Sequence, residues 1–348
     1  MRFDGGQGTW TPTVKAKVAT RGRGRLPFAA VRPDYELIPV NGTRLNTPGH
    51  ARRAPIGSIN AVSYRAELRP SALEVLSHLM DPQAAVIARS RLTGGRSVDE
   101  FEAAGLDDSA WSLDSAIAAA AAVLGRDVQE SGGGALVQAV REDVVELACD
   151  DVVTAVDGIP VTTASGLRSL LAGLDTARLT VRRAADLSRA EAELTLPVAR
   201  CTDGTWGIRV VTASRVLEHG LSASFNLPED LRGPSLGLAC ALSIVDAFTG
   251  GRLAAGGSVV ATGTVDLAGR VGAVGAIEYK ARAVAAHPQV RRFLLPAEAH
   301  DDVEQARRAL AGKAEVIAVA TLAEAVHVLG SGSRNTKAMR RSLDRHLG

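Results

Sequence analysis

Aromatic residues, cysteines and long apolar runs are all scarce in this sequence of 348 residues. Aromatic residues make up 3% of the chain and the formal net charge is +2. This argues against the base-stacking surfaces and strong basic field of nucleic-acid binders. No apolar run approaches the roughly 20 residues of a membrane span, and the longest, 116–124, favours an alanine-rich helix. No segment fits GxxxxGK[ST], so ATP-driven work by this polypeptide is not expected.

The few cysteines and histidines favour no metal site and no cofactor. Cys149, Cys201 and Cys240 lie far apart without CxxC spacing, which predicts free thiols in a reducing compartment. The seven histidines are scattered, and none pairs with a cysteine or an acidic residue at ligand spacing. Together with the missing apolar span, these features predict a soluble, cytoplasmic protein.

Composition and hydrophobic periodicity divide the chain into five parts. We expect a flexible basic arm (1–30), a mixed strand and helix segment (31–130), a β-rich domain (132–198), an α/β domain (205–329) and a polar tail (331–348). The Ser-Gly-Gly-Gly stretch at 131–134 marks one boundary. Strands and helices that alternate after a β-rich unit predict an α+β multidomain fold.

Periodicity and turn residues predict the secondary structure within these parts. Strands are expected at 35–40, 56–62, 135–140, 152–156, 159–161, 179–183, 191–196, 208–213, 222–227, 258–262, 264–267, 292–295 and 316–319. Helices are expected from Ser71, over 114–124 and 163–174, from Ser235, and over 278–286, 303–311 and 322–329.

A serine lies between glycines in Gly233-Pro234-Ser235-Leu236-Gly237, where a helix is expected to begin. Unbonded amides and the positive end of the helix dipole suit an oxyanion there. Pro234 fixes the backbone, while Gly233 and Gly237 would leave room for a substrate. The alternative is that Ser235 only caps the helix, a position that serine favours.

A lysine follows on a helix with an apolar face. Lys280 lies beside Ile277, Ala281 and Val284 at helical spacing. Burial would lower its pKa towards neutrality and let it take a proton from Ser235. The alternative is a solvated surface lysine. Taken together, the two segments predict a Ser–Lys hydrolase.

The segments 233–237 and 262–280, with 293–298 downstream, closely resemble the proteolytic domain of Lon proteases over about 205–329. The resemblance implies that Ser235 is the nucleophile and Lys280 the general base. It also implies that Thr262 orients the lysine, supported by Gly233, Pro234 and Gly263. Members of that family cleave polypeptides and often assemble as homo-oligomeric, hexameric rings.

The chain departs from the Lon pattern at three places. Leu236 stands where alanine is usual, and its larger side chain is expected to narrow the cleft. Arg232 replaces an acidic residue or glycine, and Gly275-Ala276 replaces a common Gly-Gly pair.

The stretch 151–161 resembles PDZ domains, with a likeness that covers about 132–198. It implies capture of an extended peptide as an added strand. The preceding loop, 141–150, is short and acidic and lacks the usual Gly-Pro-rich lead. The alternative is a β-rich spacer that binds nothing.

The order of these parts resembles the PDZ-containing Lon-like peptidases of bacteria, and 34–39 fits the segment that follows their membrane anchor. A membrane-associated location is therefore the alternative if an anchor precedes this start. The sequence predicts an ATP-independent serine endopeptidase that cleaves unstructured or presented polypeptides. One alternative is a catalytically silent PDZ-type peptide-binding module on a Lon-like scaffold. Another is a small-molecule kinase whose glycine-rich turn cradles phosphate.

Overall fold

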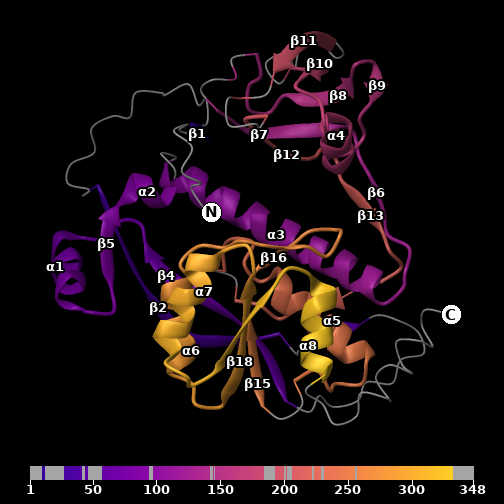
Figure 1. The fold of residues 1–348 in the computed structure, drawn as a ribbon. Helices are drawn as coiled ribbons and strands as arrows, with labels where there is room; N and C mark the ends of the chain where they lie inside the picture. The colour runs from indigo at the N-terminus through magenta and orange to yellow at the C-terminus, as the bar shows by residue number, and fades with distance from the viewer. Residues whose placement is uncertain are drawn as a thin grey trace.

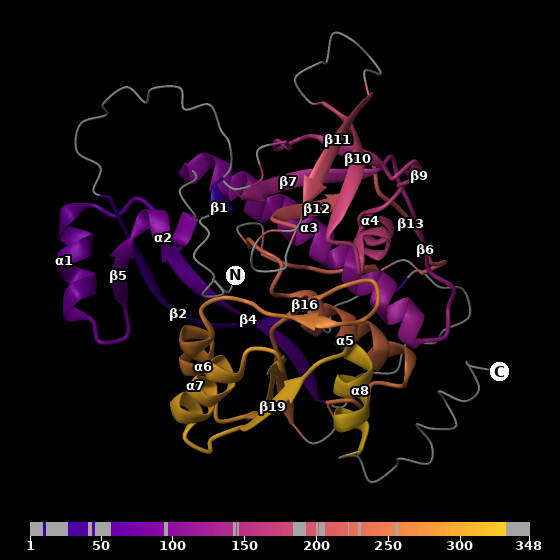
Figure 2. The ribbon, with the colours of Figure 1, turned by 45° about the horizontal axis from the view of Figure 1, so that its top comes forward.

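A computed structural model gives the fold of the chain (Figure 1). It describes residues 10–11, 27–40, 44–45, 57–93, 97–141, 144, 146–183, 193–199, 201, 206–221, 223–228, 231–254 and 257–331. The predicted tail beyond Ser331 and most of the predicted arm lie outside the described residues. The described residues form a layered sheet unit and a smaller β unit, with one long helix between them (Figures 1 and 2).

The sheet unit is built on six strands from both ends of the chain. Their order is β19 (Glu315–Val319), β18 (Val290–Pro296), β15 (Ser258–Ala261), β4 (Ser58–Glu67), β2 (Phe28–Pro39) and β5 (Ala85–Ala88). The strands from β19 to β4 are parallel, whereas β2 and β5 each run antiparallel to their neighbour. The sequence pattern separates 31–130 from 205–329, yet strands from both segments share this sheet.

Helices cover both faces of the sheet. Successive residues on a strand point to opposite faces, and β15 follows this rule. Val259 and Ala261 belong to the core shared with α5 (Gly237–Phe248) and α8 (Leu322–Ser331). Val260 belongs to the core shared with α6 (Ile277–Ala285) and α7 (His300–Leu310). The result is three layers, with α6 and α7 on one face and α5 and α8 on the other (Figure 1).

The N-terminal segment adds three helices, which are α1 (Ala72–Met80), α2 (Arg89–Thr93) and α3 (Val98–Val123). Ser71 caps α1 as predicted, in a reciprocal capping box with Glu74. The helix predicted over 114–124 is the C-terminal part of the longer α3. Helix α3 packs against α5 and lies between the sheet unit and the β unit (Figures 1 and 2).

The β unit has its own apolar core and one helix. Its elements are β7 (Ala135–Arg141), β8 (Val152–Val156), β9 (Ile159–Pro160), α4 (Ala164–Leu171), β10 (Thr176–Arg182), β11 (Glu193–Ala199) and β12 (Ile208–Thr212), with β1 (Trp10–Thr11) paired to β7. The predicted Asp157-Gly158 turn is present, with φ of 48° and 81°. Thr163 caps α4 through the Gly166 amide, and β10 and β11 form the predicted hairpin.

A two-stranded ribbon joins the two units. Strand β6 (Gln129–Ser131) leads into the β unit, and β13 (Val216–Glu218) leads out of it. The two strands pair antiparallel, with Gln129 opposite Glu218. The strand predicted over 222–227 is shorter in the structure, where β14 (Ala223–Ser224) pairs with β3 (Arg44–Leu45).

Within the described part of the chain, no helix combines the length and apolar character that a bilayer crossing requires. The prediction of free thiols is confirmed for all three cysteines. Burial raises the pKa of the Cys240 thiol to about 12, which leaves this group unreactive.

Candidate functional site

The predicted site residues gather at one edge of the sheet. The parallel strands β15, β18 and β19 end at this edge, where ligands usually bind in open α/β sheets. Thr262 and Gly263 directly follow β15 there. Ser235 comes from the layer of α5, and Lys280 lies in the first turn of α6, in the opposite layer. The end of β15 therefore lies between the elements that carry the serine and the lysine.

Hydrogen bonds connect these residues through Thr262. Lys280 Nζ donates to Thr262 Oγ1 at 3.1 Å, and Thr262 Oγ1 donates to the Ser235 carbonyl oxygen at 3.4 Å. The Gly263 amide also donates to the Ser235 carbonyl, at 3.0 Å. Among the described residues, no hydrogen bond joins the Ser235 hydroxyl directly to the Lys280 amine. Thr262 therefore bridges the amine and the serine backbone.

Lys280 is a buried amine with a strongly altered acidity. Its side chain is 1% exposed, so the alternative of a solvated surface lysine is wrong. Desolvation lowers the pKa of Lys280 to about 7, and the charge of Asp302 acts in the opposite direction. Lys280 Nζ also lies 6.0 Å from the centroid of the Tyr64 ring, and burial raises the pKa of that phenol. Near neutral pH, a substantial fraction of Lys280 is therefore an uncharged amine that can accept a proton.

Ser235 precedes α5 without capping it. The N-cap residue is Leu236, and it makes no side-chain hydrogen bond to the helix. The alternative that Ser235 serves only as the cap is therefore wrong. Within the part of the chain that the structure describes, the Ser235 hydroxyl and the amides of Ser235 and Leu236 make no hydrogen bond. No hydrogen bond within the described residues therefore occupies these three groups.

The two glycines beside Ser235 have different reasons to be glycine. Gly233 has a φ of +87°, which disfavours other residues, and a Cβ atom there would meet nothing within 4 Å. At Gly237, a Cβ atom would lie 2.9 Å from Ser112 Oγ and 3.0 Å from the Val265 amide nitrogen. The expectation that Gly237 leaves room for a substrate is therefore wrong, because that space is filled by the protein itself.

Leu236 and Arg232 both depart from the Lon pattern, but Leu236 is buried and Arg232 is exposed. Leu236 is 3% exposed and packs in the core shared by α3, α5 and α8. The expectation that it narrows an open cleft is wrong, because the side chain lies inside the protein. Arg232 is exposed, and its guanidinium donates to the Leu231 carbonyl.

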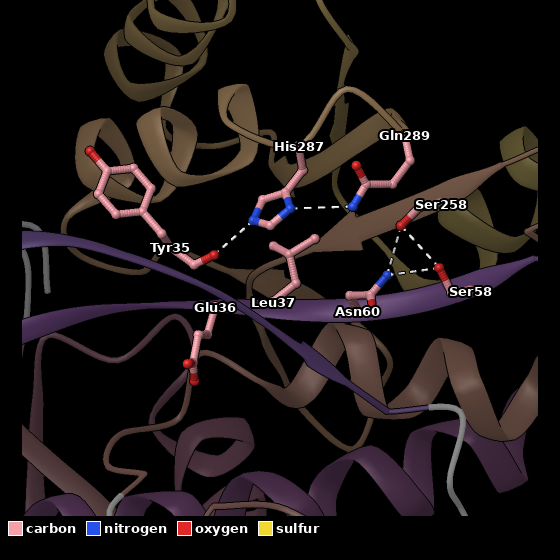
Figure 3. A pocket seen from close by; sticks show the side chains of 8 residues that line it. All are labelled: Tyr35, Glu36, Leu37, Ser58, Asn60, Ser258, His287 and Gln289. Atoms are coloured by element: carbon pink, nitrogen blue, oxygen red, sulfur yellow. Dashed lines mark hydrogen bonds between the residues drawn. The ribbon is translucent and has the colours of Figure 1, made fainter.

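A pocket of about 370 Å³ lies at the opposite edge of the sheet (Figure 3). Ser58 and Ser258 begin the parallel strands β4 and β15, and Asn60 Nδ2 donates to both of their hydroxyls. His287 Nε2 bonds the Tyr35 carbonyl on the other side of the pocket. Because Thr262 lies beyond the other end of β15, this pocket is not the place where a substrate of Ser235 would bind.

A comparison with protein-family models found a match to the part of the chain that carries these residues. The model of the Lon protease (S16) C-terminal proteolytic domain matches residues 186–330. This stretch is similar to a Lon proteolytic domain, and it includes β11 and β12 of the β unit. Such a domain implies a serine peptidase, and the match includes Ser235, Thr262 and Lys280. No curated protein matches the chain. Strands β2 and β4 precede the matched region, although they complete the sheet on which the Lon domain is built.

Sequence reasoning missed three residues of α3 that contact the Ser235 loop. Gly105, Ser109 and Ser112 share one helix face, because residues four and seven positions apart lie one above the other. Gly105 also permits close packing, since a Cβ atom there would lie 3.2 Å from Arg232 Cβ. The only signal in the sequence is this stripe of small residues, which does not reveal its partner.

We expect Thr262→Val to lower kcat by about 10- to 100-fold, because valine keeps the volume but cannot bond Lys280 Nζ. Thr262→Ser retains the hydroxyl and is the matched control. Steady-state cleavage of an unfolded protein such as casein gives kcat and KM for both variants. A Thr262→Val enzyme with the kcat of wild type would contradict an orienting role for this hydroxyl.

Proposed function

We propose that the chain is an ATP-independent serine endopeptidase in which Ser235 is the nucleophile and Lys280 the general base. One observation carries the proposal: a fully buried lysine with a pKa of about 7 is connected through Thr262 to a serine whose hydroxyl has no hydrogen bond among the described residues. The Lon proteolytic domain at 186–330 supports the same reaction class. The absence of a GxxxxGK[ST] segment from the sequence supports independence from ATP.

In the proposed reaction, the neutral Lys280 amine takes the hydroxyl proton of Ser235 as its oxygen attacks a peptide carbonyl carbon. The amides of Ser235 and Leu236 donate to the oxyanion that forms. Lys280 then gives the proton to the departing amine, which leaves an acyl ester on Ser235. Water, deprotonated by the same lysine, hydrolyses this ester and restores the serine.

The first step requires a change at Ser235, because its hydroxyl and the lysine amine are not hydrogen-bonded. Catalytic hydrogen bonds are often long before a substrate binds and shorten in its complex. A rotation of the Ser235 side chain about its Cα–Cβ bond would turn the hydroxyl without moving the bonded carbonyl. Thr262 would hold the amine in place during this rotation.

We further propose that the β unit is PDZ-like and presents extended polypeptide to the Lon domain. A groove of about 390 Å³ lies between α4 and β12, lined in part by Leu167, Leu171, Trp206 and Ile208. An extended segment can add to a strand beside such a helix. Arg168 of α4 donates to the Val210 carbonyl of β12 across this groove, so a bound peptide would displace that contact. By the resemblance of 205–329 to Lon proteases, we also expect a homo-oligomeric ring.

Covalent labelling and a pH profile test this proposal together. A fluorophosphonate is expected to label Ser235, and kcat/KM is expected to rise with pH through a midpoint of about 7. The sign follows from the lysine, which cannot accept a proton below its pKa. Ser224→Ala, which removes an exposed serine, is the matched control and should still be labelled. Absence of label on Ser235, or a flat profile between about pH 6 and pH 8, would contradict the proposal.

A further inference from the structure

Helix α3 holds the backbone directly before Ser235. Ser112 Oγ donates to the Pro234 carbonyl at 2.8 Å, and Ser109 Oγ donates to the Gly233 carbonyl at 3.1 Å. In return, the Gly233 amide donates to the Gly105 carbonyl at 2.8 Å. These α3 residues all precede the matched region 186–330, so the Lon domain receives this support from another part of the chain.

The hydrogen bond from Ser112 to the Pro234 carbonyl also affects the orientation of the Ser235 amide. The Pro234 carbonyl and the Ser235 N–H belong to one planar peptide unit, and in a trans unit they point in opposite directions. The described residues contain no cis peptide bond. The Pro234 carbonyl accepts from Ser112 Oγ at 2.8 Å and more weakly from the Gly237 amide at 3.4 Å, and the shorter bond from Ser112 turns the Ser235 N–H away from α3. That amide makes no hydrogen bond among the described residues, so it is free to meet a substrate.

The Ser112 hydroxyl packs against Gly237. Ser112 is 6% exposed, and the absence of a side chain at Gly237 leaves room for it, because a Cβ atom there would lie 2.9 Å from Ser112 Oγ. The Ser109 hydroxyl binds the loop less strongly, because its one proton is shared with the Gly105 carbonyl of its own helix, which lies closer, at 2.8 Å. The Ser112 hydroxyl is therefore the stronger of the two supports.

We propose that Ser112 is a positioning residue whose hydroxyl orients the Ser235 amide as a donor to the oxyanion. This inference rests on the proposed function. Ser112 touches neither the substrate nor the reacting atoms and acts through the Pro234 peptide unit. A donor that serves only the oxyanion affects the transition state more than the bound substrate. Its loss is therefore seen in kcat rather than in KM.

The test compares Ser112→Ala with Ser115→Ala, a serine one turn further along α3 that accepts from Arg215 instead. We expect Ser112→Ala to lower kcat by about 10- to 100-fold with KM nearly unchanged, and to weaken a peptide boronate by a similar factor. The midpoint of the pH profile should stay at the wild-type value, because Lys280 keeps its surroundings. Ser115→Ala should retain wild-type kcat. Ser112→Thr, which restores a hydroxyl, should recover part of the activity.

Two results would overturn the inference. One is a Ser112→Ala enzyme with wild-type kcat and boronate affinity. The other is a loss of thermal stability with KM and kcat changed together and the boronate bound as in wild type, which would indicate only a structural role. Either result leaves the proposed function intact if cleavage still depends on Ser235. A wild-type protein without Ser235-dependent cleavage would overturn the proposed function itself.

Discussion

Lys280→Met and Ser235→Ala are each expected to lower the rate of peptide cleavage by about 10³-fold or more. The double variant is expected to be no slower than either single variant, because in the proposed mechanism the two side chains act in the same proton transfer. Once one partner is lost, the other has nothing left to contribute. Initial rates on casein and on a short fluorogenic peptide provide the measurement.

Matched controls distinguish chemistry from folding in this experiment. Lys313→Met removes an exposed lysine, and Ser224→Ala removes an exposed serine, and both should cleave at the wild-type rate. Near-ultraviolet circular dichroism should be alike for all variants. Additive losses in the double variant would mean that the two residues act independently, and that result would exclude a Ser–Lys pair.

The same Lys280→Met substitution is expected to stabilise the fold while it removes activity. In the unfolded chain the lysine amine has its ordinary pKa of 10.5, whereas burial lowers the value to about 7 in the folded protein. This difference corresponds to a penalty on the order of 5 kcal/mol at and below neutral pH. The hydrogen bond to Thr262 is also lost, which offsets about 1–3 kcal/mol. A net gain of about 2–4 kcal/mol in the free energy of unfolding remains.

The pH dependence gives this prediction a definite sign. Between about pH 7 and pH 10.5 the unfolded chain binds the lysine proton and the folded protein does not, so wild-type stability rises with pH. The advantage of Lys280→Met should therefore be constant below about pH 7 and shrink as the pH approaches 10.5. Urea unfolding of both proteins at several pH values measures this difference. A Lys280→Met variant less stable than wild type at neutral pH would show that burial of the lysine amine does not lower the free energy of unfolding.

Local signals in the sequence were sufficient for individual elements of the fold. Ser71 and Thr163 cap helices because serine and threonine oxygens accept from free amides near the helix start. Asp157-Gly158 makes a tight turn because both residues tolerate positive φ. Each of these features depends on residues within one turn of the chain, so the pattern alone predicts them.

The pairing of distant segments was not predictable in the same way. Strand β4 pairs with β15 in parallel, with Ser58 opposite Ser258, and no local pattern encodes a register between residues so far apart. The core position of Leu236 depends on how α3, α5 and α8 meet. The bond from Ser112 to the Pro234 carbonyl has the same origin, because an exposed serine and a buried one look alike in a helical stripe.

The candidate site lies between these two cases. Ser235 and Lys280 could be proposed from the glycine spacing, the apolar helix face and the resemblance of both segments to Lon proteases. The sequence could not predict that Lys280 is only 1% exposed, because this burial depends on the packing of α6 against the end of β15. The hydrogen bonding of the Ser235 loop was not predictable from the sequence either. Its carbonyls accept hydrogen bonds from distant residues, whereas the amides of Ser235 and Leu236 make none among the described residues.

The ribbon of β6 and β13 has a consequence for how such a protein can diversify. Because the chain leaves the sheet unit and returns to it at paired residues, everything between them is an insertion with adjoining ends. A different domain with closely spaced termini could replace the β unit at this point without rerouting the layers that carry Ser235 and Lys280. Under the proposed function, substrate selection by the β unit could therefore change while the residues proposed for cleavage stay in place.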